Sequence, residues 1–320
     1  MSQELLFLEP IFKEKIWGGG RLKQEFGYPV PFEKTGECWA VSARQDGDCR
    51  VISKTYRDWT LSELWNRKRQ LFGNLPGDQF PLLIKILDAR EDLSIQVHPD
   101  DTYARLHENG QAGKSECWYI LDCEPGASVI LGHRAANRQE LRKLVLEKRW
   151  EELVQKIPVH KGDFFQIDPG SIHSIGGGIL ILEIQQNSDL TYRVYDFDRL
   201  DDKTPRELQL EQSLEVMQAP YRPVPIEAKT ISGRNYRRTE LYQCRHYSVG
   251  KLETFGHTRL ETGNFICLSV IGGNGWIDGV PLEKGDHLII PNGYGSFILE
   301  GKLTIITSAP GVRKAVAQGY

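Results

Sequence analysis

The chain has 320 residues, of which 40% are hydrophobic and 26% are charged, and its formal net charge at pH 7 is −3. This length favours two domains or one domain with a large additional part, and the composition is typical of globular proteins. The small net charge excludes binding to nucleic acid or to an anionic membrane through overall basicity. An anionic substrate would therefore need a local cluster of Lys and Arg.

The sequence shows no mark of export or membrane insertion. Its six cysteines form no Cys-x-x-Cys pair, and no window has the roughly 18 apolar residues that a membrane span requires. Residues 1–10 include two acidic side chains and no long apolar run, unlike a secretory signal. We therefore expect a cytoplasmic protein with reduced thiols in its core.

The first 121 residues are predicted to be mainly β, with two short helices. Alternating apolar residues predict strands at 38–42, 82–87, 94–97 and 116–121. Thr60-Leu61-Ser62-Glu63 is typical of a capping box and predicts a helix that continues to Leu71. A second short helix is predicted at 100–108, because its first residues are acidic.

In the rest of the chain apolar and polar residues alternate again, apart from one helical insert and one polar stretch. Strands are predicted at 128–131, 163–167 and 180–184. A single longer helix is predicted at 137–157, where Asn137 can cap the first turn and apolar residues form a stripe. Residues 196–229 are polar and contain several prolines, with a short helix predicted at 208–217. We predict a domain boundary near 220–225, between domains at 1–218 and 219–320.

A short pattern occurs twice, at 161–170 and at 284–293. Each copy reads Lys-Gly-Asp, then an apolar run, a Pro and a Gly. The pattern resembles the second motif of cupins, which are small double-sheet jelly rolls, although a Gly-Asp turn before a strand can also recur by chance. Two copies imply a mainly β fold of two cupin-type jelly-roll barrels with a small helical insert. Only the first copy is followed by a histidine, His173, so we expect metal in the first barrel and a metal-free second barrel.

The stretch Leu-Ser-Ile-Gln-Val-His-Pro-Asp-Asp at 93–101 holds the first candidate metal ligands. Gln96 and His98 are two residues apart, so on a strand they share one face. Alone, both could be ordinary hydrogen-bonded polar residues. The stretch resembles part of a cupin metal site, which has a His-x-His pair, a Glu on a neighbouring strand and a His later in the sequence. Glu116 and His173 are the candidates for that Glu and that later His. This set of two imidazoles, a carboxylate and an amide suits one Zn²⁺ or another divalent first-row ion per chain.

Charged residues near these ligands indicate an anionic substrate. Lys114 is two residues before Glu116 and shares its face on an extended chain. Lys85 lies within an apolar run, where it either faces a cavity or a partner or extends to solvent from an edge. Glu183 also lies in an apolar run, where it could be a general base with a raised pKa or the partner of a Lys or Arg.

Several segments together resemble the type I mannose-6-phosphate isomerase family in its shorter bacterial form. The stretch Leu-Ser-Ile-Gln-Val-His-Pro-Asp is the most specific of them, and the segments follow the family order over most of residues 5–200. The matching segments are 16–19 (Ile-Trp-Gly-Gly), 36–39 (Gly-Glu-Cys-Trp), 84–89 (Ile-Lys-Ile-Leu-Asp-Ala), 93–100, 114–116 (Lys-Ser-Glu), the turn before His173, and 187–193.

The resemblance implies a role for each matching residue. It implies a zinc site with the ligands Gln96, His98, Glu116 and His173. It implies Arg193 as a catalytic residue, and it implies pocket positions for Lys114, Lys85, Glu37, Ser94, Trp17 and Glu183. The helical insert is short beside that of the long-form enzymes, and residues 194–199 differ from that form. The phosphate-binding residue therefore stays open, with Arg199 and Lys203 as candidates that could equally be exposed loop charges.

The implied reaction is the interconversion of mannose 6-phosphate and fructose 6-phosphate. A proton moves between C2 and C1 through a cis-enediol, while the metal polarises O1 and O2 and Arg193 stabilises the enediolate. The base stays open between Glu183, a metal-bound hydroxide and Lys114.

Two other classes compete with this interpretation. A cupin oxygenase could use His98, Glu116 and His173 on iron, and a sugar-binding cupin module is a further alternative. The nearby Lys and Arg favour a small anionic sugar phosphate as the partner. We expect no nucleic-acid or membrane partner, and a monomer or weak homodimer.

Overall fold

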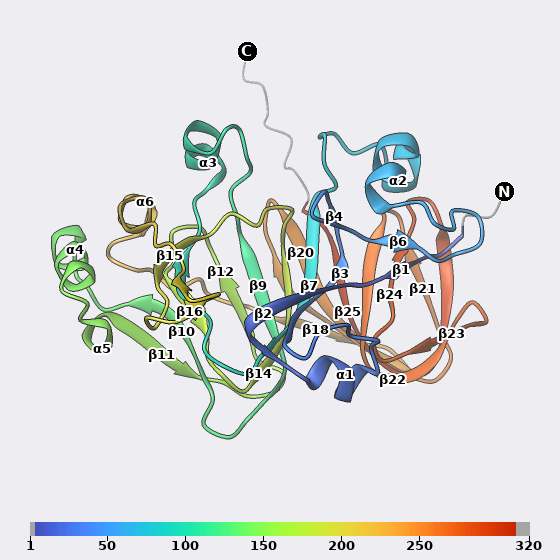
Figure 1. Cartoon of the computed structure of the whole chain (residues 1–320). Coiled ribbons are helices and arrows are strands. Elements are labelled where there is room, and N and C mark those ends of the chain that lie inside the picture. Colours follow the sequence, from blue (N-terminus) through green and yellow to red (C-terminus); the bar gives the residue numbers. More distant parts are fainter. Residues whose placement is uncertain (1–3, 312–320) are drawn as a thin grey trace, which may run out of the picture.

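Most of the chain forms β-strands, arranged as two units that lie side by side (Figure 1). The structure is a computed structural model and describes residues 4–311. The predicted mainly β architecture is confirmed, and each strand predicted from alternation is present within three residues at either end. No helix within residues 4–311 is long and apolar enough to span a bilayer.

Two sheets form the first unit. The six-stranded sheet contains, in spatial order, β12 (Phe164–Ile167), β9 (Glu116–Cys123), β14 (Ile179–Gln186), β7 (Leu82–Ala89), β2 (Ile11–Gly19) and β3 (Thr35–Val41). The five-stranded sheet contains β11 (Val154–Pro158), β10 (Ser128–His133), β13 (His173–Ile175), β8 (Ile95–Val97) and β15 (Tyr192–Tyr195). Their inner faces share one apolar cluster, in which Trp118 and Ile181 of the first sheet pack with Val129 and Ile175 of the second. This is the double-sheet packing of a jelly roll.

One larger sheet forms the second unit, and it includes the N-terminal strand. Its main path is β18 (Lys229–Ser232), β19 (Tyr236–Gln243), β20 (Tyr247–Phe255), β25 (Gly295–Pro310), β22 (Ile266–Ile277), β24 (His287–Ile290), β1 (Leu6–Glu9) and β6 (Arg50–Val51). Off this path, β21 (Thr258–Thr262) pairs with β25 and β23 (Val280–Glu283) pairs with β22. The strand β1 pairs with β24, so the chain begins in the second unit before it builds the first.

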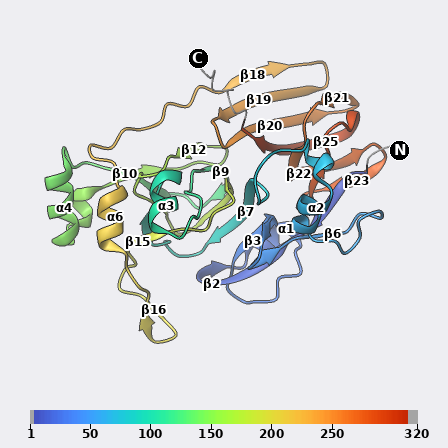
Figure 2. The ribbon, with the colours of Figure 1, turned by 90° about the horizontal axis from the view of Figure 1, so that it is seen from above.

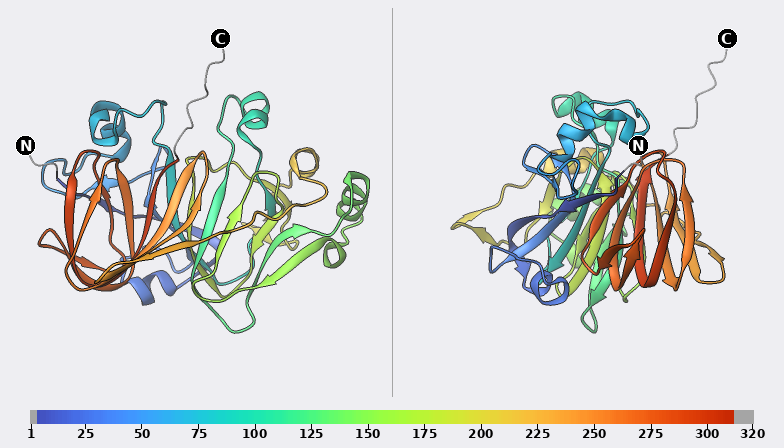
Figure 3. Two further views of the ribbon diagram at one scale, coloured as in Figure 1. Left: turned by 180° about the vertical axis from the view of Figure 1, so that it is seen from behind. Right: turned by 90° about the vertical axis from the view of Figure 1, so that its right-hand side faces the viewer.

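The connection between the units is long. After α6 (Leu210–Val216), the chain crosses the molecule to reach β18, as the views from above and from behind show (Figures 2 and 3). This crossing contains the predicted boundary at 220–225. The division at residue 218 stays a prediction, and residues 1–3 and 312–320 of its two domains lie outside the described part of the chain.

The remaining elements are short helices and two-stranded ribbons. The helices are α1 (Arg21–Phe26), α2 (Leu61–Arg67), the 3-10 turn Arg69–Phe72, α3 (Asp101–His107), α4 (Arg138–Leu146) and α5 (Trp150–Leu153). The ribbons join β4 (Ala43–Arg44) to β5 (Gly47–Asp48) and β16 (Leu200–Asp201) to β17 (Thr204–Pro205). The predicted capping box at Thr60 is confirmed, since Thr60 Oγ1 accepts from the Glu63 amide and the Glu63 carboxylate accepts from the Thr60 amide.

The prediction of one helix over 137–157 is wrong in its second half. Asn137 caps α4 as expected, but this helix ends at Leu146, and Lys148 has a positive φ of 54°. After the single turn of α5, the chain continues as β11, in which Ile157 pairs with Val129 of β10. Pairing with an existing sheet edge therefore outweighs the helical spacing of the apolar residues, and the β-branched Ile157 suits a strand.

The repeated Lys-Gly-Asp pattern forms the same turn in both units. Gly162 and Gly285 have φ values of 94° and 105°. Asp163 accepts a hydrogen bond from the amide three residues earlier, at 2.8 Å, and Asp286 does the same at 2.8 Å. Each turn leads into a strand, β12 and β24 respectively. The two copies of this sequence pattern therefore also adopt the same local structure.

Gly170 is expected to be intolerant of any side chain. Its φ is 84°, and a Cβ atom would lie 2.7 Å from the Val216 carbonyl oxygen. Its amide donates to the His98 carbonyl at 2.8 Å, so it joins the His98 segment to the turn before His173. We expect Gly170→Ala to lower the free energy of unfolding by about 2 kcal/mol or more. Denaturant unfolding measures this, with Gly110→Ala as the control, because Gly110 has a similar φ of 82° but open space around it.

Candidate metal centre and active site

The candidate ligands come from both sheets of the first unit. Gln96 lies in β8 and pairs directly with His173 of β13 and with Arg193 of β15. Directly opposed residues of antiparallel strands project to the same side, so these three side chains share one face of the five-stranded sheet. Glu116 begins β9 in the other sheet, and His98 follows β8. Sheet pairing therefore brings together residues that are far apart in the sequence.

Three buried side chains form the centre of the site. The Nε2 atom of His98 lies 3.5 Å from Glu116 Oε2, and the Nε2 atom of His173 lies 3.3 Å from Glu116 Oε1. One potential ligand atom from each residue lies within 4.8 Å of the others, and none of the three residues is more than 1% exposed. The predicted grouping of His98, Glu116 and His173 is confirmed as a possible metal site.

The hydrogen bonds of the two histidines prepare them to bind a metal. His98 Nδ1 lies 2.8 Å from the Leu190 carbonyl, and His173 Nδ1 lies 2.8 Å from the Ser171 carbonyl. A carbonyl only accepts, so each Nδ1 carries the proton and each neutral ring turns the lone pair of Nε2 towards Glu116. His98 Nε2 and Glu116 Oε1 are buried with no hydrogen-bond partner among the described residues. The two imidazole Nε2 atoms and the carboxylate fit a divalent cation.

The electrostatic environment keeps these groups in their metal-binding forms. Burial, together with the Lys114 ammonium, lowers the pKa of His98 to about 3. Burial alone would raise the pKa of Glu116, but Lys114 and the two histidines lower it well below the ordinary value. Lys114 Nζ lies 2.6 Å from Glu116 Oε2, and its own side chain is buried. The two imidazoles are therefore neutral and the carboxylate is ionised at neutral pH.

Gln96 lies beside this centre. Its Nε2 atom is 3.2 Å from His173 Nε2, and its Oε1 atom is 3.5 Å from the hydroxyl of Ser94. The amide nitrogen, rather than the oxygen, faces the imidazole, and a half-turn of the amide would exchange the two atoms. Gln96 as a fourth ligand stays a prediction.

A second buried cluster surrounds Lys85. Its Nζ atom lies 2.7 Å from Asp189 Oδ1, and it lies 3.9 Å from carboxylate oxygens of both Glu37 and Glu183. Lys85 is only 3% exposed, which excludes the alternative of an edge lysine that extends to solvent. Sequence analysis gave Asp189 no role, although a lysine predicted inside an apolar strand requires a carboxylate partner.

Glu183 lies between the two clusters. It pairs with Lys85 on β7 and with Trp118 on β9, and Trp118 Nε1 donates to its carboxylate at 3.3 Å. Burial and the Glu116 carboxylate raise the pKa of Glu183 to about 8, against the opposing effect of Lys114 and Lys85. It thus combines both predicted properties, a lysine neighbour and a raised pKa.

The raised pKa of Glu183 predicts a pH-dependent stability in the metal-free protein. The folded state binds a proton at Glu183 up to about pH 8, whereas the unfolded chain releases it near the ordinary pKa of about 4.3. The free energy of unfolding should therefore fall as the pH rises from about 4.3 to about 8. Glu183→Gln should remove at least about 1 kcal/mol of this fall. Urea unfolding of both proteins at pH 5 and pH 8 measures the difference, and equal falls would contradict the prediction.

The remaining predicted residues differ in their surroundings. Arg193 Nη1 donates to the Glu207 carbonyl at 3.2 Å, while its Nε is buried with no partner among the described residues. Arg199 is held in place, because Asp196 Oδ1 lies 2.7 Å from its Nη2. Arg206, which sequence analysis missed, pairs with the same Asp196. Trp17 is buried in the apolar cluster between the sheets, and Lys203 is exposed in the turn between β16 and β17.

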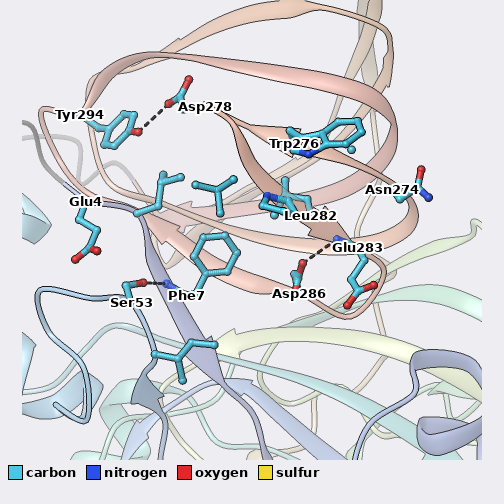
Figure 4. A pocket seen from close by; sticks show the side chains of 15 residues that line it. Glu4, Phe7, Ser53, Asn274, Trp276, Asp278, Leu282, Glu283, Asp286 and Tyr294 are labelled. Atoms are coloured by element: carbon cyan, nitrogen blue, oxygen red, sulfur yellow. Dashed lines mark hydrogen bonds between the residues drawn. The ribbon is translucent and has the colours of Figure 1, made fainter.

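A cavity of about 820 Å³ lies elsewhere, in the second unit (Figure 4). Phe7 and Leu282 form part of its apolar lining, and Asp278 holds Tyr294 at its upper side. Four carboxylates line it, and no Lys or Arg does, which disfavours an anionic sugar phosphate. The candidate metal ligands instead lie in the first unit.

The double-sheet fold and the buried His-Glu-His cluster are those of a cupin with a possible metal site. The chain matches the family model for the phosphomannose isomerase type I catalytic domain over residues 5–116. It also matches the model for the mannose-6-phosphate isomerase cupin domain over residues 237–310. These matches and the relatives described next show that the chain belongs to the type I mannose-6-phosphate isomerase family.

The similarity to individual relatives extends over nearly the whole chain. Mannose-6-phosphate isomerase ManA of Bacillus subtilis is 48% identical over 96% of this chain and 99% of its own. The mannose-6-phosphate isomerase of Streptococcus mutans is 45% identical over 95% of this chain and 98% of its own. A crystal structure of mannose 6-phosphate isomerase from B. subtilis has a TM-score of 0.94 at 43% identity, covering 96% of this chain and 100% of that chain. The predicted family, fold class and cupin character are therefore confirmed.

Proposed function

We propose that this chain interconverts mannose 6-phosphate and fructose 6-phosphate by metal-assisted proton transfer through a cis-enediol. The observation that carries the proposal is the buried centre, in which two neutral imidazoles direct Nε2 towards an ionised Glu116. Two relatives that are 48% and 45% identical over nearly the full length are named mannose-6-phosphate isomerase.

The metal in this proposal is one Zn²⁺ per chain. His98, Glu116 and His173 would hold it, with Gln96 as the fourth ligand, and this set of nitrogen and oxygen ligands suits zinc. When bound, a divalent ion polarises the oxygens on the carbons that exchange the proton. Lys114 then has a second role, because its ammonium lies at Glu116 and can donate hydrogen bonds to a substrate oxygen.

We propose Glu183 as the base that removes the proton at C2. With its pKa raised to about 8, Glu183 is ionised in only part of the molecules at neutral pH, but in that ionised form it is a stronger base than an ordinary glutamate. The same carboxyl group can return the proton to C1, because the two carbons of a cis-enediol present one face to it. Lys114 is the alternative base, and its raised pKa makes it the weaker candidate, since a base must first lose its proton.

The substrate would lie among the remaining charged residues. Lys85 offers a buried ammonium whose position is fixed by Asp189 and Glu37, which suits a hydroxyl or phosphate oxygen. Arg193 faces the same side of its sheet as Gln96 and offers a planar fork for two adjacent enediolate oxygens. Arg199 is the proposed phosphate contact, together with the pocket positions of Glu37, Ser94 and Trp17. We also retain a cytoplasmic location, a catalytic domain at 1–218 and a monomer or weak homodimer as predictions.

One assay separates this function from its competitors. Purified protein is incubated with mannose 6-phosphate under oxygen-free conditions, with and without a chelator, and fructose 6-phosphate is measured. Formation of fructose 6-phosphate that a chelator abolishes supports the proposal and excludes an oxygenase. Saturable binding of mannose 6-phosphate without turnover would instead favour a sugar-binding module.

A further inference from the structure

A buried tyrosine of the second unit forms a hydrogen bond with the segment Lys114-Ser115-Glu116 of the first unit. Tyr247 begins β20 in the second unit, and its side chain is fully buried. Its hydroxyl lies 3.2 Å from the hydroxyl of Ser115 and donates to Gln166 Oε1 at 3.0 Å. Ser115 and Gln166 belong to the first unit, so these bonds cross from one unit to the other.

These three side chains close a ring of hydrogen bonds. Gln166 Nε2 donates to Ser115 Oγ at 3.0 Å, and Tyr247 donates to the amide oxygen of the same Gln166. The Ser115 hydroxyl proton is then left to donate to the Tyr247 oxygen. Every hydroxyl in the ring donates once and accepts once, an arrangement in which each bond strengthens the next. Gln166 Nε2 also bonds to Asp168 at 2.9 Å, which fixes the orientation of its amide.

Ser115 stands between two residues of the proposed catalytic machinery. Lys114 and Glu116 contact one another at the metal centre, while the Ser115 side chain points away from them towards Tyr247. The Ser115 amide donates to Gln186 Oε1 at 2.9 Å, and its carbonyl accepts from the Gln186 amide at 3.1 Å. Every polar group of Ser115 is therefore engaged, and the hydroxyl is the one held by the second unit.

We propose that Tyr247 is a positioning residue, through which the second unit holds Lys114-Ser115-Glu116 in its metal-binding geometry. The proposal rests on the proposed function for its catalytic consequence, but its structural part concerns only the placement of Glu116. Partners that orient metal ligands affect metal affinity without touching the ion. The second unit would thus contribute to the candidate metal centre of the first unit.

The test removes only the hydroxyl groups of this ring. Tyr247→Phe, Ser115→Ala and the double variant are compared with wild type in Zn²⁺ affinity, measured by competition with a chelator, and in kcat and KM for mannose 6-phosphate. Tyr294→Phe is the matched control. It also removes a tyrosine hydroxyl from the second unit, one bonded to Asp278 at 2.7 Å, but this tyrosine lines the cavity of Figure 4 and not the ring of hydrogen bonds at Ser115.

We expect Tyr247→Phe to weaken Zn²⁺ binding about 10-fold and to lower kcat more than it changes KM. Ser115→Ala should have the same effect, and the double variant should be little worse than either, because both substitutions open one ring. The control should retain the wild-type Zn²⁺ affinity and kcat.

Wild-type Zn²⁺ affinity and kcat in Tyr247→Phe would overturn the proposal, even if its melting temperature fell, since Tyr247 would then be a core residue only. Should Tyr247→Phe fail to fold, wild-type Zn²⁺ affinity in Ser115→Ala would overturn it in the same way. If wild type binds Zn²⁺ but does not isomerise mannose 6-phosphate, the proposed function fails, and the affinity comparison still decides the role of Tyr247.

Discussion

His98→Ala is expected to abolish stoichiometric metal binding and to lower kcat by at least about 1000-fold. The imidazole has no hydrogen-bond partner at Nε2 among the described residues, and its Nδ1 proton is held by the Leu190 carbonyl. Its side chain therefore offers one lone pair to the centre, and alanine removes it. Metal content by mass spectrometry and turnover of mannose 6-phosphate, measured on the same preparation, check both parts of this result.

The control for His98→Ala is His160→Ala. His160 is exposed, with 83% of its side chain accessible, and lies outside the cluster of candidate ligands. This variant should retain wild-type metal content and kcat. If His98→Ala remained fully active after treatment with a chelator, metal would have no part in the reaction and the centre would be structural.

Arg193→Ala is expected to lower kcat by roughly 100-fold while it leaves the metal content near wild type. Arg193 pairs with Gln96 across two strands, so its side chain is directed to the ligand face of the sheet. Its Nε is buried without a partner among the described residues, so at least one donor of the fork is free for an oxygen of the substrate. Burial, together with the nearby Arg206, lowers the pKa of Arg193, but the guanidinium stays charged.

A comparison with lysine sharpens this prediction. Arg193→Lys keeps the positive charge but cannot contact two adjacent oxygens at once, so we expect it to recover only part of the lost kcat. Equal loss of metal and activity in Arg193→Ala would show that Arg193 supports the fold of the site through its bond to the Glu207 carbonyl. Full recovery by lysine would show that charge alone is needed.

The ligand centre was predicted from the sequence because its signals are local. Gln96 and His98 are two residues apart, and His173 follows a Pro-Gly turn, so spacing and turn chemistry identified them before any contact was known. The resemblance to cupin metal sites, which have a Glu on a neighbouring strand, added Glu116 to this set. The buried His-Glu-His cluster confirms that these three residues meet.

The partners of the charged residues could not be predicted in this way. Lys85 was recognised as unusual in an apolar strand, but its partner Asp189 lies 104 residues away and belongs to a loop. Asp196 and Arg206 are only ten residues apart, but the turns and the two-stranded ribbon between them follow no regular spacing that would predict their contact. In the helical insert, by contrast, the sequence predicted too much structure of one kind. The helical spacing of apolar residues continues into residues that in fact form the strand β11. In each case the outcome depends on which strand edge or charge lies nearby in the folded chain.

The sequence by itself determined the mainly β class, the repeated turn, the helix caps and the candidate ligands. These features depend on residues within one turn or one strand of each other, where sterics and alternation act directly. Only the tertiary structure decided the pairing of His173 with Gln96, 77 residues apart, and the entry of β1 into the second sheet. It also decided the contact of Tyr247 with Ser115, because the sheet register and the packing of the two units set which distant side chains meet.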